Sequence, residues 1–215
     1  MEKIIYNRFL LVKDNFYSAP QKVLKQAEAA TYYQPEHITG YRSTTVYHEE
    51  GIKKKLENLL GIKITRWDMD PLEENGVFYH GFSEGQKKEQ PGVHSDEPYN
   101  DITILIYLKP GIPTECGTSL WKHKETGLTD PPNANDAKRL GMKVADIHEL
   151  LIHDSRLRSK WIEIDRVGNQ FNRMVAYPSG VFHSASRHYG SNMENGRIYQ
   201  TLRVGVDWNS FRMKN

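Results

Sequence analysis

The sequence predicts an α+β chain whose core is a β-sandwich or barrel, and three observations support this class. Helical patterns lie near the start of the chain, at about residues 18–31 and 52–60. Short β-type runs separated by turn signals follow them. One run, residues 101–108, is continuously apolar and β-branched, as is typical of a strand buried on both faces. Among such folds the jelly roll is the natural candidate for about eight short strands.

The first third of the chain predicts two helices and several short strands. Pro20, two residues after Ser18, favours the start of a helix that continues to about Thr31. A second helix fits residues 52–60, and Gly61 ends it. Short strand-like runs occur at residues 4–6, 9–12, 62–67 and 76–82.

The remainder of the chain is dominated by strand patterns around one helical insertion. Apolar residues recur at helical spacing over residues 136–153, and a loop rich in Pro, Asn and Asp precedes them at residues 129–135. The predicted strands lie at residues 101–108, 118–122, 160–164, 170–177 and 197–208. We expect one domain over residues 1–215, with a helix-containing N-terminal support (1–75) and a core over residues 76–208.

Composition excludes several classes of function. The 215 residues are 38% hydrophobic and 26% charged, with a formal net charge of +2, so nothing indicates a nucleic-acid or membrane partner. No apolar stretch is long enough to span a bilayer, and the N-terminus lacks a signal-peptide pattern, so we expect a cytoplasmic protein. Cys116 is the single cysteine, against nine histidines. A metal site would therefore use imidazole and carboxylate ligands.

Two short motifs carry candidate metal ligands. His94 and Asp96 are two residues apart, and in a strand they would present an imidazole and a carboxylate on the same side. His183 follows a strand-like run and a Pro-Ser-Gly turn. Two histidines and one carboxylate form the facial triad of non-haem iron(II) oxygenases, which leaves metal positions open for other ligands. A closed structural zinc site would need a fourth protein ligand.

A third motif supplies an anion-binding residue. Arg197 opens the last predicted strand. A guanidinium stays charged and can bind a carboxylate through two parallel hydrogen bonds. This is the anchor that a dicarboxylate such as 2-oxoglutarate requires.

In these motifs the chain resembles the iron(II)/2-oxoglutarate-dependent oxygenases, and within them the prolyl-4-hydroxylase-like branch. The resemblance covers roughly residues 76–208 and depends on the order and spacing of its pieces. These are Gly92-Val93-His94-Ser95-Asp96, Leu105-Ile106-Tyr107-Leu108-Lys109, Gly117-Thr118-Ser119-Leu120-Trp121, Met174-Val175-Ala176-Tyr177-Pro178-Ser179 with His183, and Gly196-Arg197-Ile198-Tyr199.

The resemblance implies a double-stranded β-helix, a cupin-like jelly roll with the metal at its open mouth. It implies that His94, Asp96 and His183 hold Fe(II), and that Arg197 binds the distal carboxylate of 2-oxoglutarate. Tyr107 matches a tyrosine that often bonds the same carboxylate, although a core aromatic is an equal interpretation. The reaction implied consumes dioxygen and 2-oxoglutarate, hydroxylates a substrate, and releases succinate and CO2. Aspartate at position 96 favours hydroxylation or desaturation over halogenation.

Departures from the family pattern leave some roles open. The segment between His183 and Arg197 is longer than usual, so Arg203, six residues further along the same strand, is the reserve anchor. Arg187, within that segment, is a candidate substrate contact. The insertion at about residues 130–159 has no counterpart in the family and is a lid, a dimer contact or surface decoration.

The substrate and the class of reaction have alternatives. An amino acid, a peptide or a natural-product intermediate is expected, and Trp121, Tyr79, His80, Phe82 and His123 are candidates for its pocket, with core positions as the alternative for the aromatic residues. Competing functions are a cupin-like metal dioxygenase without 2-oxoglutarate, a non-enzymatic jelly-roll binding module, and a zinc hydrolase. Only the oxygenase employs both histidines, the aspartate and the arginine together.

Overall fold

The computed structural model describes residues 9–35, 40–83, 92–96 and 100–211. The strand predicted at residues 4–6 lies outside this part of the chain. The helices are α1 (Pro20–Ala29), α2 (Ile52–Leu60), α3 (Ala134–Leu140) and α4 (Val144–Asp154). The strands are β1 (Leu11–Lys13), β2 (Tyr32–Tyr33), β3 (Tyr41–Ser43), β4 (Lys63–Arg66), β5 (Val77–Gly81), β6 (Ile102–Tyr107), β7 (Thr118–His123), β8 (Trp161–Val167), β9 (Met174–Pro178), β10 (His183–Ala185) and β11 (Arg197–Asp207).

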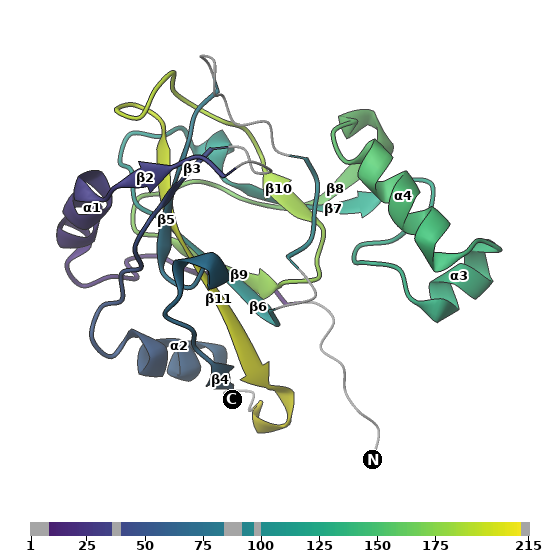
Figure 1. The fold of residues 1–215 in the computed structure, drawn as a ribbon, viewed down its shortest axis with the longest axis horizontal. Coiled ribbons are helices and arrows are strands. Elements are labelled where there is room, and N and C mark those ends of the chain that lie inside the picture. Colours follow the sequence, from purple (N-terminus) through teal and green to yellow (C-terminus); the bar gives the residue numbers. More distant parts are fainter. Residues whose placement is uncertain (1–8, 36–39, 84–91, 97–99, 212–215) are drawn as a thin grey trace.

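The strands form two antiparallel sheets (Figure 1). The large sheet has eight strands in the order β1-β9-β6-β11-β5-β3-β2, with β4 paired to the far end of β11. The small sheet has the order β10-β7-β8. β11 is the central strand, since it pairs with β5 along its first half and with β6 further along.

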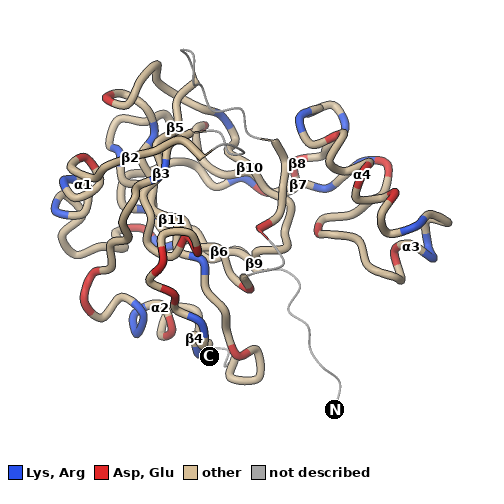
Figure 2. The backbone as a smooth tube through the Cα atoms, viewed as in Figure 1, with Lys and Arg blue, Asp and Glu red and all other residues tan. Residues whose placement is uncertain are grey.

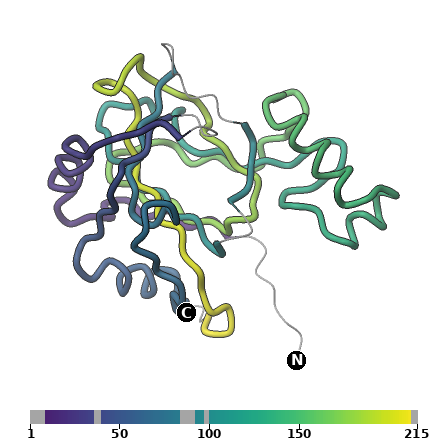
Figure 3. The backbone as a smooth tube through the Cα atoms, in the orientation of Figure 1, coloured from purple at the N-terminus to yellow at the C-terminus, as the bar shows by residue number. Residues whose placement is uncertain are grey.

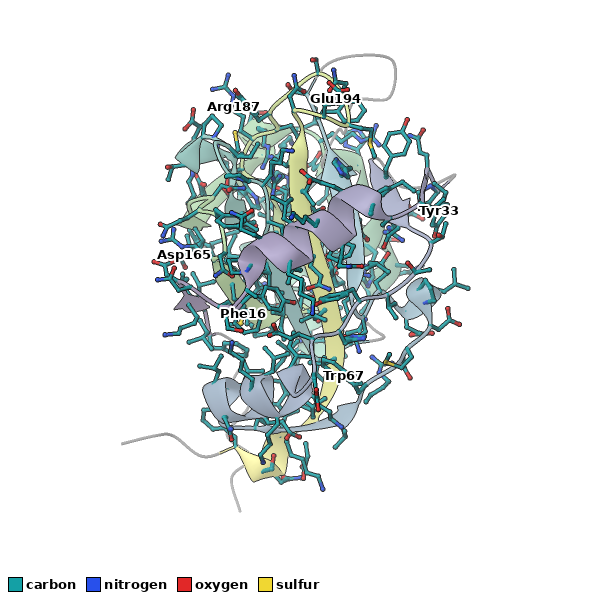
Figure 4. The ribbon with its side chains drawn as sticks, turned by 90° about the vertical axis from the view of Figure 1, so that its left-hand side faces the viewer. Phe16, Tyr33, Trp67, Asp165, Arg187 and Glu194 are labelled. Carbon is teal, nitrogen blue, oxygen red and sulfur yellow. The ribbon has the colours of Figure 1, made fainter. Side chains whose placement is uncertain are left out.

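One face of the large sheet is covered by the two N-terminal helices. Apolar residues of α1 and α2 pack against alternate residues of the strands, and β11 contributes Ile198, Leu202, Val204 and Val206 to this core. Figure 4 shows α1 crossing in front of this sheet, with β11 behind it in yellow. Two helix boundaries lie where the sequence indicates. Pro20 is the first residue of α1, and Gly61 ends α2 in the left-handed region at φ 67°.

The other face of the large sheet packs on the small sheet. Leu105, Val175 and Tyr177 from the large sheet meet Leu120 and Val167 from the small one in a second apolar core. The result is the mixed helix-and-sheet architecture with large antiparallel sheets that the sequence predicts. The jelly-roll connectivity itself stays a prediction.

The insertion between β7 and β8 forms a separate helical pair beside the sheets (Figures 1 and 3). The prediction of one helix over residues 136–153 is wrong, because Gly141 adopts φ 66° and ends α3 before α4 begins at Val144. A third core of Ile147, Leu151, Trp161 and Phe182 ties α4 to the strands.

Other differences concern short elements. The strand predicted at residues 170–177 begins only at Met174, because Asn172 is in the left-handed region at φ 63° and bonds to Tyr17. The sequence did not reveal β2, β3 or β10, each only two or three residues long. Acidic and basic residues are interspersed over the described backbone (Figure 2). None of the helices in the described part of the chain has the length and apolar character needed to cross a membrane.

Candidate metal and anion-binding site

A cavity of about 660 Å³ lies between the two sheets and α4. The large sheet contributes the residues that point away from its helix-covered face. On β11 these alternate along the strand: Arg197, Tyr199, Thr201 and Arg203. Segment 92–96 and β10 supply the opposite wall.

The three predicted metal ligands converge in this cavity. His94, Asp96 and His183 offer ligand atoms that all lie within 4.8 Å of one another. The Nε2 atom of His183 lies 3.4 Å from Asp96 Oδ2, and that of His94 lies 3.7 Å from Asp96 Oδ1. Segment 92–96 forms no named strand, but reciprocal backbone hydrogen bonds of 3.0 and 2.8 Å pair His94 with His183. The extended backbone therefore places His94 and Asp96 as the spacing predicts.

Backbone carbonyl groups orient both imidazoles. Nδ1 of His183 lies 2.8 Å from the Val181 carbonyl oxygen, and Nδ1 of His94 lies 3.0 Å from that of Gly92. Each contact requires the proton on Nδ1, which leaves Nε2 with a free lone pair. Such outer contacts are typical of metal-binding histidines because they fix the tautomer and the direction of the ring.

Asp96 is buried and held by two donors. Thr103 Oγ1 donates to Oδ2 at 2.7 Å, and Arg203 Nη2 donates to Oδ1 at 2.7 Å. Burial opposes ionisation, but Arg203 and the two histidines outweigh it and lower the pKa of Asp96 well below its ordinary value. The carboxylate is therefore charged at neutral pH and suited to a divalent cation. Two imidazoles and one carboxylate fit a metal such as iron(II).

A chain of charged groups extends from Asp96 across the pocket floor. Arg203 also pairs with the buried Glu74, which in turn pairs with Arg42. Glu74 is in the left-handed region at φ 55°, which few non-glycine residues adopt. No sequence pattern indicates Arg42 or Glu74, because their partners lie far away along the chain. Since Arg203 holds two of the protein's own carboxylates, its predicted role as reserve anchor for 2-oxoglutarate is not favoured.

Arg197 differs from Arg203 in its hydrogen bonding. It is 2% exposed, and its Nε and Nη1 atoms have no hydrogen-bond partner within the described residues. Its guanidinium carbon lies 5.1 Å from the centre of the Tyr199 ring. A buried cation without an anion is costly, so this side chain is suited to an acidic ligand entering the pocket.

Two tyrosines lie near these groups. Tyr107 is fully buried in the core between the sheets, and its hydroxyl lies 2.7 Å from Thr118 Oγ1. Burial raises the pKa of Tyr107, and the charge of Arg197 partly offsets that rise. Tyr177, a member of the motif that precedes His183, lines the pocket, and its ring centre lies 4.8 Å from that of His183. Its buried hydroxyl has no hydrogen-bond partner among the described residues.

The other predicted pocket residues have mixed outcomes. Tyr79 lines the cavity under Arg42, whereas Trp121, His80 and Phe82 are buried outside its lining. His123 does not face solvent or the cavity, since it is buried between Thr126 and Asp154. Arg187 is exposed near Glu115 and does not line the cavity either. The insertion is more than surface decoration, because α4 forms part of the pocket wall.

Comparison with known proteins gives one family and several similar solved structures, two of which are described here. A search of curated proteins finds no match. A prolyl hydroxylase from Trichoplax adhaerens, in complex with a hypoxia inducible factor peptide fragment, is 15% identical with a TM-score of 0.46, over 94% of this chain and 84% of that one. HygX from Streptomyces hygroscopicus, with nickel and 2-oxoglutarate bound, is 13% identical with a TM-score of 0.44, over 93% and 83%.

The family comparison covers most of the sequence. The model described as "Family of unknown function (DUF6445)" matches residues 3–198. Because this match spans far more than half of the chain, the protein belongs to the DUF6445 family.

Proposed function

We propose that this protein is an Fe(II)- and 2-oxoglutarate-dependent oxygenase that hydroxylates a small molecule or peptide. One observation carries the proposal: a His-Asp-His cluster lines the same cavity as the buried Arg197, whose Nε and Nη1 atoms have no hydrogen-bond partner among the described residues. A metal chelated by a keto acid needs both features, three protein ligands at the metal and a cation for the far carboxylate. The two facing antiparallel sheets are compatible with the jelly roll that the family resemblance implies.

In this proposal His94, Asp96 and His183 hold the iron. Their carbonyl and hydroxyl contacts keep the Nε2 lone pairs and the carboxylate directed at one point before any ion arrives. Three protein ligands leave coordination positions open for the keto acid and dioxygen. When bound there, iron(II) supplies the redox chemistry that couples oxidation of 2-oxoglutarate to oxidation of the substrate.

Arg197 binds the distal carboxylate of 2-oxoglutarate in this proposal. Its burial excludes water from the ion pair, which strengthens the attraction, and its ring neighbour Tyr199 limits its movement. Tyr107 lies close enough to Arg197 for their charges to interact, which supports a part for it in the same subsite. Asp96 favours hydroxylation or desaturation, and a chloride-dependent product would contradict this.

The test uses metal-free protein mixed with iron(II) and 2-oxoglutarate under nitrogen. Chelation of the keto acid gives a weak visible charge-transfer band that needs no substrate. We expect the band in the wild type, its loss in His183→Ala, and a much higher 2-oxoglutarate requirement in Arg197→Ala. Arg187→Ala, an exposed arginine outside the cavity, is the matched control and should behave as the wild type.

Absence of the band in wild-type protein that binds iron would overturn the 2-oxoglutarate assignment. A metal dioxygenase without this cosubstrate, or a binding module, would then be the better interpretation. Equal 2-oxoglutarate requirements in Arg197→Ala and Arg187→Ala would remove Arg197 from its role without affecting the metal site.

A further inference from the structure

The inserted helix α4 presents one continuous face to the cavity. Three residues of its C-terminal half line the pocket from one side of the helix: His148, Leu151 and Ile152. Ser155 and Arg156, in the turn that directly follows α4, continue the same wall. Segment 92–96 and β10 supply the metal cluster and the large sheet supplies Arg197, so α4 is a wall that neither the metal nor the cosubstrate would occupy.

This wall is joined directly to the metal segment. The Val93 backbone N–H donates to the Ser155 carbonyl oxygen at 2.8 Å, next to His94. Val93 and Phe182 also pack with Leu151 in one apolar core. A molecule resting on α4 would therefore lie beside the metal cluster, where a substrate must be.

The side chains on the wall are of two kinds. Ile152 is a large apolar residue that is 72% exposed although it lines the pocket. Covering it with an apolar group would remove that surface from water, which is favourable. One turn further, Arg156 is exposed and has no ion pair or hydrogen bond with any residue that the structure describes.

The charges of the residues that line the pocket indicate the sign of the substrate's charge. Among the described lining residues, the arginines at positions 42, 156, 197 and 203 face only two carboxylates, Glu74 and Asp96. Both carboxylates are already paired with Arg42 or Arg203. A divalent metal and the dianion of 2-oxoglutarate would cancel each other's charge, so the positive excess persists in the loaded site. A pocket lined by positive charge attracts negatively charged ligands.

We infer that the substrate is a small organic acid with an apolar body, bound with its acidic group at Arg156 and its apolar part on Ile152. The inference rests on the proposed function and adds a substrate class and a specificity-determining element to it. It also assigns the insertion a role, since α4 would decide which molecules reach the metal.

The experiment measures binding of defined probes by calorimetry. Protein loaded with iron(II) and saturating 2-oxoglutarate under nitrogen, so that Arg197 is occupied, is titrated with hexanoate and phenylacetate, with their primary amides, and with hexyl phosphate. We expect an acid to bind at least about tenfold more tightly than the matching amide. The preferred acid, carboxylate or phosphate, identifies the acidic group of the natural substrate.

Matched variants locate the binding. Arg156→Gln should abolish the preference for acids over amides, whereas Arg187→Gln should leave it unchanged. Ile152→Ala should weaken binding of the acids several-fold, whereas Leu157→Ala, a change at another exposed apolar residue of the insertion that lies outside the lining, should not. All four positions are exposed, so these variants are expected to fold.

The outcomes separate the two proposals. If the 2-oxoglutarate band is present but no acid binds, or if amides bind as well as acids, the substrate inference is overturned while the proposed function stands. The same holds if Arg156→Gln has no effect. Absence of the band in wild type counts against the proposed function itself.

Discussion

The two faces of the large sheet are made by alternate residues of the same strands, yet they have opposite character. On β11, Ile198 and Leu202 pack beneath the helices, while Arg197 and Arg203 line the cavity one residue away. The helix-covered face also has a buried polar residue, Gln200, but it is fully engaged with Tyr17, Tyr47 and Gly76.

We expect the helix-covered face of the large sheet to contribute mainly to stability and the pocket face mainly to ligand binding. On the helix-covered face the Gln200 amide is satisfied within the fold, as is usual in protein interiors, whereas the buried Nδ1 of His80 has no hydrogen-bond partner among the described residues. The pocket face leaves the Nε and Nη1 atoms of Arg197 and the Tyr177 hydroxyl without hydrogen-bond partners among the described residues. Arg197 stays charged, unlike the neutral His80 ring, so its burial is more costly and suits it to an acidic ligand. Substitutions on the two faces should therefore have different consequences.

The largest effect is expected at Asp96 on the pocket side. Asp96→Asn keeps the shape of the side chain but removes the charge that faces both imidazoles and Arg203. We expect affinity for iron(II) or cobalt(II) to fall by more than about 100-fold, since loss of outer contacts alone costs about 10- to 100-fold. Asp165→Asn, an exposed carboxylate on β8, is the control. An affinity within about tenfold of wild type would show that Asp96 is not a ligand.

Leu202→Ala tests the helix-covered face. Leu202 is fully buried, and its truncation leaves a cavity, so the free energy of unfolding should fall by about 2–5 kcal/mol. Metal affinity of the folded protein should not change. Denaturant unfolding measures the first quantity and a cobalt(II) titration the second. Ile162→Ala, at an exposed position of β8, should cost less than about 0.5 kcal/mol. Weaker metal binding in Leu202→Ala would contradict the separation of the two faces.

His80 gives the helix-covered face a dependence on pH. Burial, assisted by Lys109, lowers the pKa of His80 to about 4. Below the ordinary pKa of 6.5 the unfolded imidazole takes up a proton that the folded one excludes, so stability falls as the pH falls towards about 4. Between about pH 7 and about pH 5 the loss should be about 2 kcal/mol.

His80→Phe should make this dependence shallower. The substitution removes the titrating group but keeps an aromatic ring beside Tyr32, whose ring centre is 4.8 Å away. Urea unfolding of both proteins across this pH range measures the difference. Identical slopes would mean that His80 does not titrate as its burial indicates.

The smallest effect is expected at Glu74, at the far end of the charged chain. Glu74→Gln removes a partner of Arg203, which then holds Asp96 less firmly and leaves more positive charge near the metal. We expect metal affinity to fall by about tenfold. The neighbouring Glu73 is exposed, so Glu73→Gln is a close control. Equal affinities in both variants would confine the role of Glu74 to the fold.

Much of the fold could be predicted because local signals and tertiary packing agree. Pro20 and Gly61 mark helix ends whatever the surroundings, and the β-branched run at residues 101–108 is buried on both faces as its composition indicates. The single helix predicted over residues 136–153 was wrong because periodicity continues through Gly141, while the backbone does not. Strands as short as β2 and β10 have no periodicity of their own and exist through their pairing.

The sequence by itself determined the chemistry available to this protein: two histidines and an aspartate at strand-like spacing, an arginine at the start of a late strand, and too few cysteines for another kind of metal site. Tertiary structure alone decided how the two arginines differ, since Arg203 is paired with Asp96 and Glu74 whereas the Nε and Nη1 atoms of Arg197 have no hydrogen-bond partner in the described part of the chain. It also decided that α4 forms a pocket wall. The physical reason is that spacing along the chain fixes which way neighbouring side chains point, whereas partners distant in sequence meet only when the sheets and the insertion pack together.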